Sequence, residues 1–75
     1  MSLVLDCRGQ LCPLPVIELA RRISEVPVGD CIDLVADDPA ARSDVAAWCR
    51  LRDQAYLGES IAADGVAIYR VGRLA

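Results

Sequence analysis

Apolar side chains recur with helical spacing in two stretches of the chain. In the first, from Pro13 to Glu25, apolar residues stand at positions i, i+3, i+4 and i+7, and charged residues occupy the opposite side. In the second, Asp38 precedes Pro39 as a helix cap, and an apolar stripe continues to about Asp53. The pattern therefore predicts two amphipathic helices, with Pro13 and Pro39 as their first residues.

Four shorter stretches have the alternation and composition of strands. They are Leu3–Cys7, Cys31–Ala36, Tyr56–Ala62 and Val66–Val71. Asp64-Gly65, between the last two, suits a tight hairpin turn. Right-handed crossovers put both helices on one face of the sheet. The predicted fold is a single domain of residues 1–75, an α/β two-layer sandwich of order β-α-β-α-β-β with a mixed four-stranded sheet, whose other face is only partly apolar.

Charge and hydropathy exclude several classes of partner. The net charge is −3 and all eight basic residues are Arg, without a sustained basic stripe, so we expect no direct contact with nucleic acid. No apolar run approaches the roughly 20 residues that span a bilayer, and no basic region followed by an apolar one marks the start. The sequence predicts a cytoplasmic protein that does not bind membranes.

The nucleophile, if there is one, is a cysteine. The chain contains no His, which excludes Cys-His dyads, Ser-His-Asp triads and His-containing zinc sites. Its four cysteines are Cys7, Cys12, Cys31 and Cys49. A zinc ribbon needs two close pairs and the second pair is absent, so we expect no metal.

Cys12 stands directly before the first proline of the first helix. A residue before proline is pushed out of helical conformation, so we predict that Cys12 is the N-cap and Pro13 the first helical residue. Because Pro13 and Pro15 lack an N–H group, the N–H groups of Leu14 and Val16 are the early donors left to face the sulfur. The positive end of the helix lowers the pKa of such a thiol. The alternative is that Cys12 is only a small apolar side chain that fills the corner between the strand and the helix. These arguments do not decide between a reactive and a structural Cys12.

The same residues resemble a known family. The matching positions are Leu5-Asp6, Gly9, Cys12-Pro13-Leu14-Pro15, Val16, Asp37-Asp38-Pro39-Ala40, Asp44 and Trp48-Cys49. They are similar to the CPxP signature and second helix of the TusA (SirA-like) sulfur carriers. The resemblance implies four strands, two helices and a cysteine, here Cys12, that takes up sulfane sulfur as a transient persulfide without another cofactor. It also implies a donor protein, such as a cysteine desulfurase or a rhodanese, and an acceptor protein in tRNA thiolation, molybdenum cofactor synthesis or sulfur metabolism.

The chain departs from that family at charged positions. Many relatives carry Lys where this chain has Glu18, and a basic residue where it has Ser43, with Arg42 one place earlier. Glu18 opposes a lowered pKa at Cys12. Four arginines are candidates for the rim of the thiol or for docking an acidic partner: Arg8, Arg21, Arg22 and Arg42. A solvated helix face also explains Arg21 and Arg22.

Other readings stay open. Cys7 could form a disulfide with Cys12, which would make the chain a thiol redox module. Cys49 fits a buried structural cysteine, and Trp48 fits the core. Asp37 and Asp38 could form a carboxylate pair, although capping explains Asp38. A further alternative is a regulatory or interaction domain in which Cys12 is idle.

Overall fold

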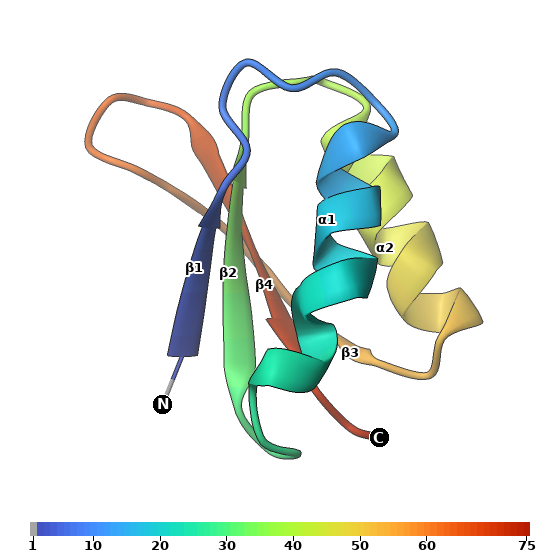
Figure 1. Cartoon of the computed structure of the whole chain (residues 1–75). Helices are drawn as coiled ribbons and strands as arrows, with labels where there is room; N and C mark the ends of the chain where they lie inside the picture. The colour runs from blue at the N-terminus through green and yellow to red at the C-terminus, as the bar shows by residue number, and fades with distance from the viewer. Residues whose placement is uncertain (1) are drawn as a thin grey trace.

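Two helices cover one face of a four-stranded mixed sheet (Figure 1). This computed structural model describes residues 2–75, so Met1 of the predicted domain lies outside the described residues. The strands are β1 (Ser2–Asp6), β2 (Cys31–Ala36), β3 (Ala55–Ile61) and β4 (Ala67–Gly72). The helices are α1 (Leu14–Arg22), a short 3-10 helix η1 (Ile23–Glu25) and α2 (Ala41–Leu51). The predicted α/β two-layer sandwich is confirmed.

The strand order, β1-β2-β4-β3, determines where the connections meet. β1 runs parallel to β2, and β4 is antiparallel to both of its neighbours. The carboxyl ends of β1 and β2 therefore lie at the same end of the sheet, where the connections to α1 and α2 begin. β4 finishes at the opposite end of the sheet, because Gly72 pairs with Cys31 at the start of β2. The start of β1 and the C-terminus of the chain also lie at this opposite end of the sheet (Figure 1).

The core lies between the sheet and the helices. Its largest fully buried aliphatic side chains come from α1, α2 and the two central strands: Leu19, Val45, Ile32, Leu34 and Val71. Burial of each such side chain contributes about 1.5–3 kcal/mol relative to exposure. On the other face of the sheet, Arg70 forms an ion pair with Asp33 at 2.8 Å. No helix within residues 2–75 is both long and apolar enough to cross a bilayer.

Both helices begin later than predicted. Pro13 is the N-cap of α1, with non-helical torsions (φ −100°, ψ 18°), and Leu14 is the first helical residue. The Cys12–Pro13 peptide bond is cis. α2 begins at Ala41, and one oxygen of Asp38 accepts the N–H of Ala40 in the turn before it. Pro13, Pro39 and Asp38 thus lie in the approaches to the two helices, whereas Pro15 lies in the first turn of α1.

The hairpin between β3 and β4 turns where the sequence predicted. The N–H of Gly65 donates to the carbonyl of Ala62 at 2.9 Å, and the N–H of Ala62 donates to the carbonyl of Val66 at 2.8 Å. Gly65 has a φ of +88°, which favours glycine. The Asp64-Gly65 turn is therefore confirmed.

Candidate functional site

The loop that carries Cys12 is held by two aspartates from the end of β2. Both carboxylate oxygens of Asp37 accept the N–H of Gly9, at 3.1 and 3.0 Å. One oxygen of Asp38 accepts the N–H of Cys12 at 2.6 Å. Because charged acceptors make the stronger hydrogen bonds, the two carboxylates hold this loop at both its start and its cysteine.

A third attachment comes from the β3–β4 hairpin. The guanidinium of Arg8 donates to Asp64 of the hairpin at 2.8 Å and to Asp6 at 2.9 Å. The backbone N–H of Arg8 also donates to Asp6. The Cys12 loop is thus fastened to β2 on one side and to the hairpin on the other.

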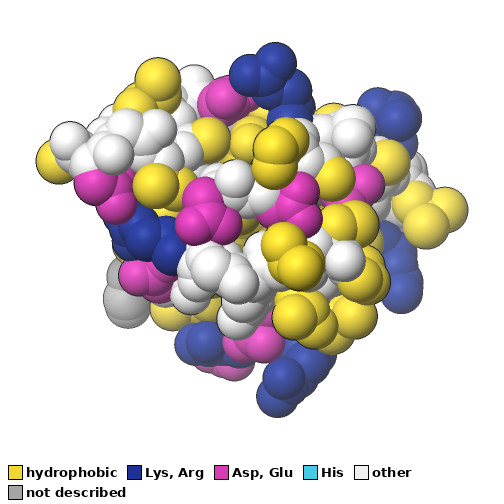
Figure 2. Space-filling model, turned by 90° about the horizontal axis from the view of Figure 1, so that it is seen from above, with side chains coloured by type: hydrophobic (Ala, Val, Ile, Leu, Met, Phe, Trp, Pro, Cys, Tyr) yellow, Lys and Arg dark blue, Asp and Glu magenta, His cyan; other side chains and the backbone are white. Residues whose placement is uncertain are grey.

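Cys12 is exposed at the mouth of an apolar groove between α1 and α2. The cavity has a volume of about 310 Å³ and is lined by Cys12, Pro13, Val16, Asp44, Ala47, Trp48 and Leu51. Leu51 is 79% exposed at one end of the groove, and Leu11, next to Cys12, is 70% exposed. Figure 2 shows the face that carries both helix starts, where acidic side chains lie among hydrophobic ones and basic side chains lie toward the margins.

Asp44 is the side chain that contacts the sulfur. The Sγ of Cys12 donates a hydrogen bond to Oδ2 of Asp44 at 2.6 Å. This bond, followed by partial desolvation and by the charges of Asp44 and Asp38, raises the pKa of Cys12 above its usual value. A shift in this direction favours the thiol over the thiolate at neutral pH.

The predicted helix-start support of a thiolate is therefore wrong. Cys12 is not the N-cap, and the N–H of Leu14 donates to the carbonyl of Leu11 at 2.9 Å, away from the sulfur. Pro15 is buried, and Val16 contributes its side chain to the groove wall. The hydrogen bond to the neighbouring carboxylate of Asp44 is the largest cause of the shift, and the pKa of Cys12 is raised where a lowered one was expected. The expected effect of Glu18 falls elsewhere, since its charge raises the pKa of Cys7.

The other three cysteines lie in different environments. Cys7 and Cys49 are buried in the core, and burial is the main cause that raises the pKa of each. Cys31 is half-buried at the start of β2, on the edge opposite Cys12. All four are free cysteines, and a buried Cys7 with an exposed Cys12 does not favour the predicted disulfide alternative. The expected burial of Cys49 and Trp48 is confirmed.

The predicted docking arginines do not gather around the thiol. Arg21 and Arg22 occupy the last turn of α1, about 12 Å along the helix axis from its start, and both pair with Glu18. Arg22 pairs with Glu25 as well. The described contacts of these two arginines fit the solvated helix face.

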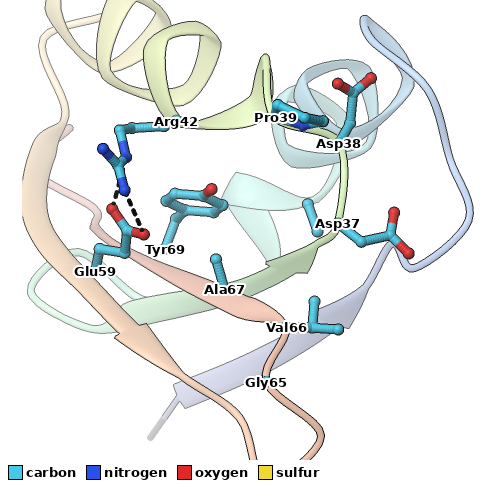
Figure 3. Close-up of a pocket in the computed structure, with 10 residues that line it drawn as sticks. Asp37, Asp38, Pro39, Arg42, Glu59, Gly65, Val66, Ala67 and Tyr69 are labelled. Atoms are coloured by element: carbon cyan, nitrogen blue, oxygen red, sulfur yellow. Dashed lines mark hydrogen bonds and ion pairs between the residues drawn. The ribbon is translucent and has the colours of Figure 1, made fainter.

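Arg42 belongs to a different, larger cavity. It pairs with Glu59 at 2.9 Å beside the ring of Tyr69, in a cavity of about 500 Å³ (Figure 3). The carboxylates of Asp37 and Asp38 point away from this cavity (Figure 3). None of the residues that line it is a cysteine. The smaller groove at Cys12 is therefore the candidate site.

Sequence reasoning missed the roles of Asp38 and Asp44. From the sequence, Asp38 is expected to be a helix cap or one of a carboxylate pair with Asp37, and Asp44 is only one of the positions that match the family. A signal for Asp38 was available, because parallel β1 and β2 place the residues that follow them side by side. For Asp44, the signal was its position four residues before Trp48, which places both side chains on the same flank of α2.

Trp48 carries a buried polar group that has no partner among the described residues. The ring is nine-tenths buried and lines the groove beside Cys12. Its indole N–H is buried and finds no acceptor within residues 2–75. Buried polar groups are usually paired, and in the described part of the chain the only other buried, unpaired side-chain nitrogen or oxygen is Oε1 of Gln10, which does not line the groove.

The sequence as a whole matches one family. The family described as "Sulfurtransferase TusA" matches residues 3–73. The chain belongs to the TusA family. Within that family it is 31% identical over 61 residues to the sulfur carrier protein TusA of Pseudomonas savastanoi pv. phaseolicola, a match that covers 81% of this chain and 67% of that one.

Other TusA-type relatives are longer than the matched region. The chain is 30% identical over 57 residues to the putative sulfur carrier protein YrkF of Bacillus subtilis. This match covers 76% of this chain and 31% of YrkF. It is 48% identical over 40 residues to a putative sulfur carrier protein of Archaeoglobus fulgidus, about half of each chain (53% and 52%). The crystal structure of a SirA-like protein from Desulfitobacterium hafniense has the same fold, with a TM-score of 0.81 over the whole of both chains at 20% identity.

Proposed function

We propose that this TusA-family chain carries sulfur as a persulfide on Cys12 and passes it to an acceptor protein. The observation that carries the proposal is the placement of Cys12, an exposed thiol on an anchored loop at the mouth of an apolar groove. Among the described cysteines, Cys7 and Cys49 are buried and Cys31 is half-buried, so Cys12 is the accessible sulfur. The relatives named as sulfur carriers support the same role.

The chemistry is an exchange between sulfur atoms. Cys12 loses its proton to solvent, and its thiolate attacks the outer sulfur of a persulfide on the donor. The bond between the two donor sulfurs breaks, the donor leaves as a thiolate, and Cys12 carries the sulfur as Cys12–S–SH. An acceptor thiolate then attacks that outer sulfur and regenerates the Cys12 thiolate. Electrons balance without an oxidant, a reductant, a metal or a histidine.

The residues around Cys12 have separate roles in this exchange. Asp38 fixes the backbone of Cys12, and Asp37 fixes the start of the same loop, so the sulfur is presented in one place. The apolar groove accommodates the segment of a partner that brings its own sulfur to Cys12. Suitable donors are a cysteine desulfurase or a rhodanese, and the acceptor belongs to tRNA thiolation, molybdenum cofactor synthesis or sulfur metabolism. The reducing cytoplasm would keep the four thiols free.

The intact mass of the protein after incubation with a sulfur donor tests the proposal directly. The reduced protein is incubated with a cysteine desulfurase and cysteine, or with a rhodanese and thiosulfate. We expect wild type to gain one sulfur atom that dithiothreitol removes, and Cys12→Ser to gain none. Cys31→Ser is the matched control, because it removes a half-buried thiol at the opposite edge of the sheet and should load as wild type does.

Two outcomes contradict the proposal. Absence of an adduct from both donors would favour a regulatory or interaction domain with an idle Cys12. Loss of two hydrogens, with a peptide that links Cys7 to Cys12, would favour the thiol redox module.

A further inference from the structure

The contact between Cys12 and Asp44 has a cost for a sulfur carrier. A carboxylate that accepts a hydrogen bond from a thiol favours the protonated sulfur, whereas exchange needs the thiolate. Within residues 2–75, Asp44 forms no ion pair that would neutralise it. The resting protein therefore holds its nucleophile in the less reactive form.

Acidic groups surround this sulfur, and no basic group of the described chain balances them. From α2 Asp44 contacts the sulfur, and from the β2–α2 connection Asp38 contributes its charge. No arginine within residues 2–75 lines the groove, and Arg8 and Arg42 are paired with acidic side chains elsewhere, Arg8 with Asp6 and Asp64 and Arg42 with Glu59. Figure 2 shows acidic and apolar side chains together on the face that carries both helix starts.

We propose that Asp44 is a positioning residue that keeps Cys12 as a thiol until a cationic side chain of the docked partner pairs with its carboxylate and frees the sulfur. A Lys or Arg beside the partner's own sulfur removes the acceptor from the thiol. It also supplies the positive charge that stabilises the thiolate. This inference rests on the proposed function, and it names the chemistry of the partner, an apolar segment with a basic residue. Charge complementarity selects such a partner over neutral or acidic thiol compounds.

The groove offers a second reason to expect an occupant. Leu51 at the end of the groove and Leu11 beside Cys12 are largely exposed, so a docked segment finds apolar contact as well as Asp44. The basic residue pairs with Asp44 while the apolar part of the segment covers the groove.

The first test measures the protonation of Cys12 without any sulfur donor. Alkylation by neutral iodoacetamide is followed against pH, with peptide mapping at Cys12, for wild type, Asp44→Asn and Glu59→Gln. We expect the Asp44→Asn profile to move to lower pH, with about a tenfold gain in rate at neutral pH for each unit of displacement. Glu59→Gln also removes one carboxylate near α2 but touches no cysteine, so its profile should coincide with wild type. Coincident profiles for wild type and Asp44→Asn, or equal displacement in both variants, would overturn the proposal.

The second test asks whether a cation selects the site. Disulfide exchange at Cys12 is measured with cystamine, which is cationic, and with hydroxyethyl disulfide, which is neutral. The ratio of the two rates is normalised to the ratio for free cysteine. We expect wild type to prefer cystamine several-fold beyond free cysteine, added salt to weaken the preference, and Asp44→Asn to lose it. The salt series needs only wild type, so the test stands even if the variant does not fold, and an unchanged ratio in high salt would contradict the proposal.

The two hypotheses fail separately. If Cys12 takes up sulfur but the profiles coincide, the carrier role stands and the role of Asp44 falls. If Asp44→Asn shifts the profile but no donor loads Cys12, Asp44 still holds the sulfur as a thiol, and the carrier role falls.

Discussion

Two kinds of thiol in this molecule have a raised pKa for different physical reasons. Cys49 lies in the core, where burial disfavours its charged form. Cys12 is exposed, and a hydrogen bond to Asp44 has the same effect on it. Burial changes only when the fold opens, whereas a carboxylate is neutralised by any cation that binds it. The first thiol is protected by packing, and the second is held by a contact that a partner can replace.

We expect the largest effect from a substitution that disrupts the packing of the core. Leu19→Ala removes a fully buried side chain of α1, and we expect the free energy of unfolding to fall by about 2–5 kcal/mol in denaturant titrations. Labelling of Cys7 and Cys49 should accelerate as the core opens more often, while Cys12 reacts at its wild-type rate.

Ile17→Ala, on the exposed side of the same helix, is the control and should cost much less. An equal acceleration at Cys12 would mean that its reactivity also depends on the core, and the distinction between the two thiols would fail.

The free energy of unfolding at alkaline pH tests the effect of burial on Cys7 and Cys49. Unfolded thiols titrate near pH 9.0, and burial raises the pKa of Cys7 and Cys49 in the folded protein. The folded state therefore keeps protons that the unfolded state has lost. Stability is fully present below the unfolded pKa and falls as pH rises above it, by at most about 1.4 kcal/mol per pH unit for each thiol.

Denaturant titrations in a Cys12→Ser background isolate this effect from the exposed thiol. Measurement stops near pH 9.5, below the usual titration of tyrosine. Adding Cys49→Ala should reduce the slope, and an unchanged slope would show that burial is not its source.

Removing the carboxylate that holds the Cys12 backbone sharpens the comparison. In Asp38→Ala the N–H of Cys12 loses its acceptor, and we expect its hydrogen exchange to quicken by about tenfold, the factor that matches one hydrogen bond of ordinary strength. Asp37→Ala is the matched variant and should quicken exchange at Gly9 instead. Unchanged exchange at both sites would mean that these carboxylates do not fix the loop.

The smallest expected effect concerns the edge of the groove. Leu51→Ser changes a side chain that is 79% exposed, so the free energy of unfolding should shift by about 0.5 kcal/mol or less. Alkylation of Cys12 by a small neutral reagent should also stay as in wild type. A loss comparable with that of Leu19→Ala would place Leu51 in the core and remove the groove from the surface.

The sequence predicted the fold well because the core depends on local periodicity. Alternating apolar residues in Cys31–Ala36 and the Asp64-Gly65 turn each carry their own signal, and both elements appear where expected. The choice of Cys12 also needed no long-range information. Its surroundings did, because Asp44 lies 32 residues away and reaches the sulfur only after α1 and α2 pack together. A prediction from the helix start alone therefore gave the wrong direction for the pKa of Cys12.

The start of β1 and the C-terminus of the chain lie at the end of the sheet opposite Cys12 (Figure 1). An affinity tag, a surface linker or a fused domain at either end would therefore leave the helix starts and the groove open. A chain tethered in this way to a resin or a sensor would present its sulfur outward, to the solution. That orientation suits the molecule to capture of proteins that bind at the groove.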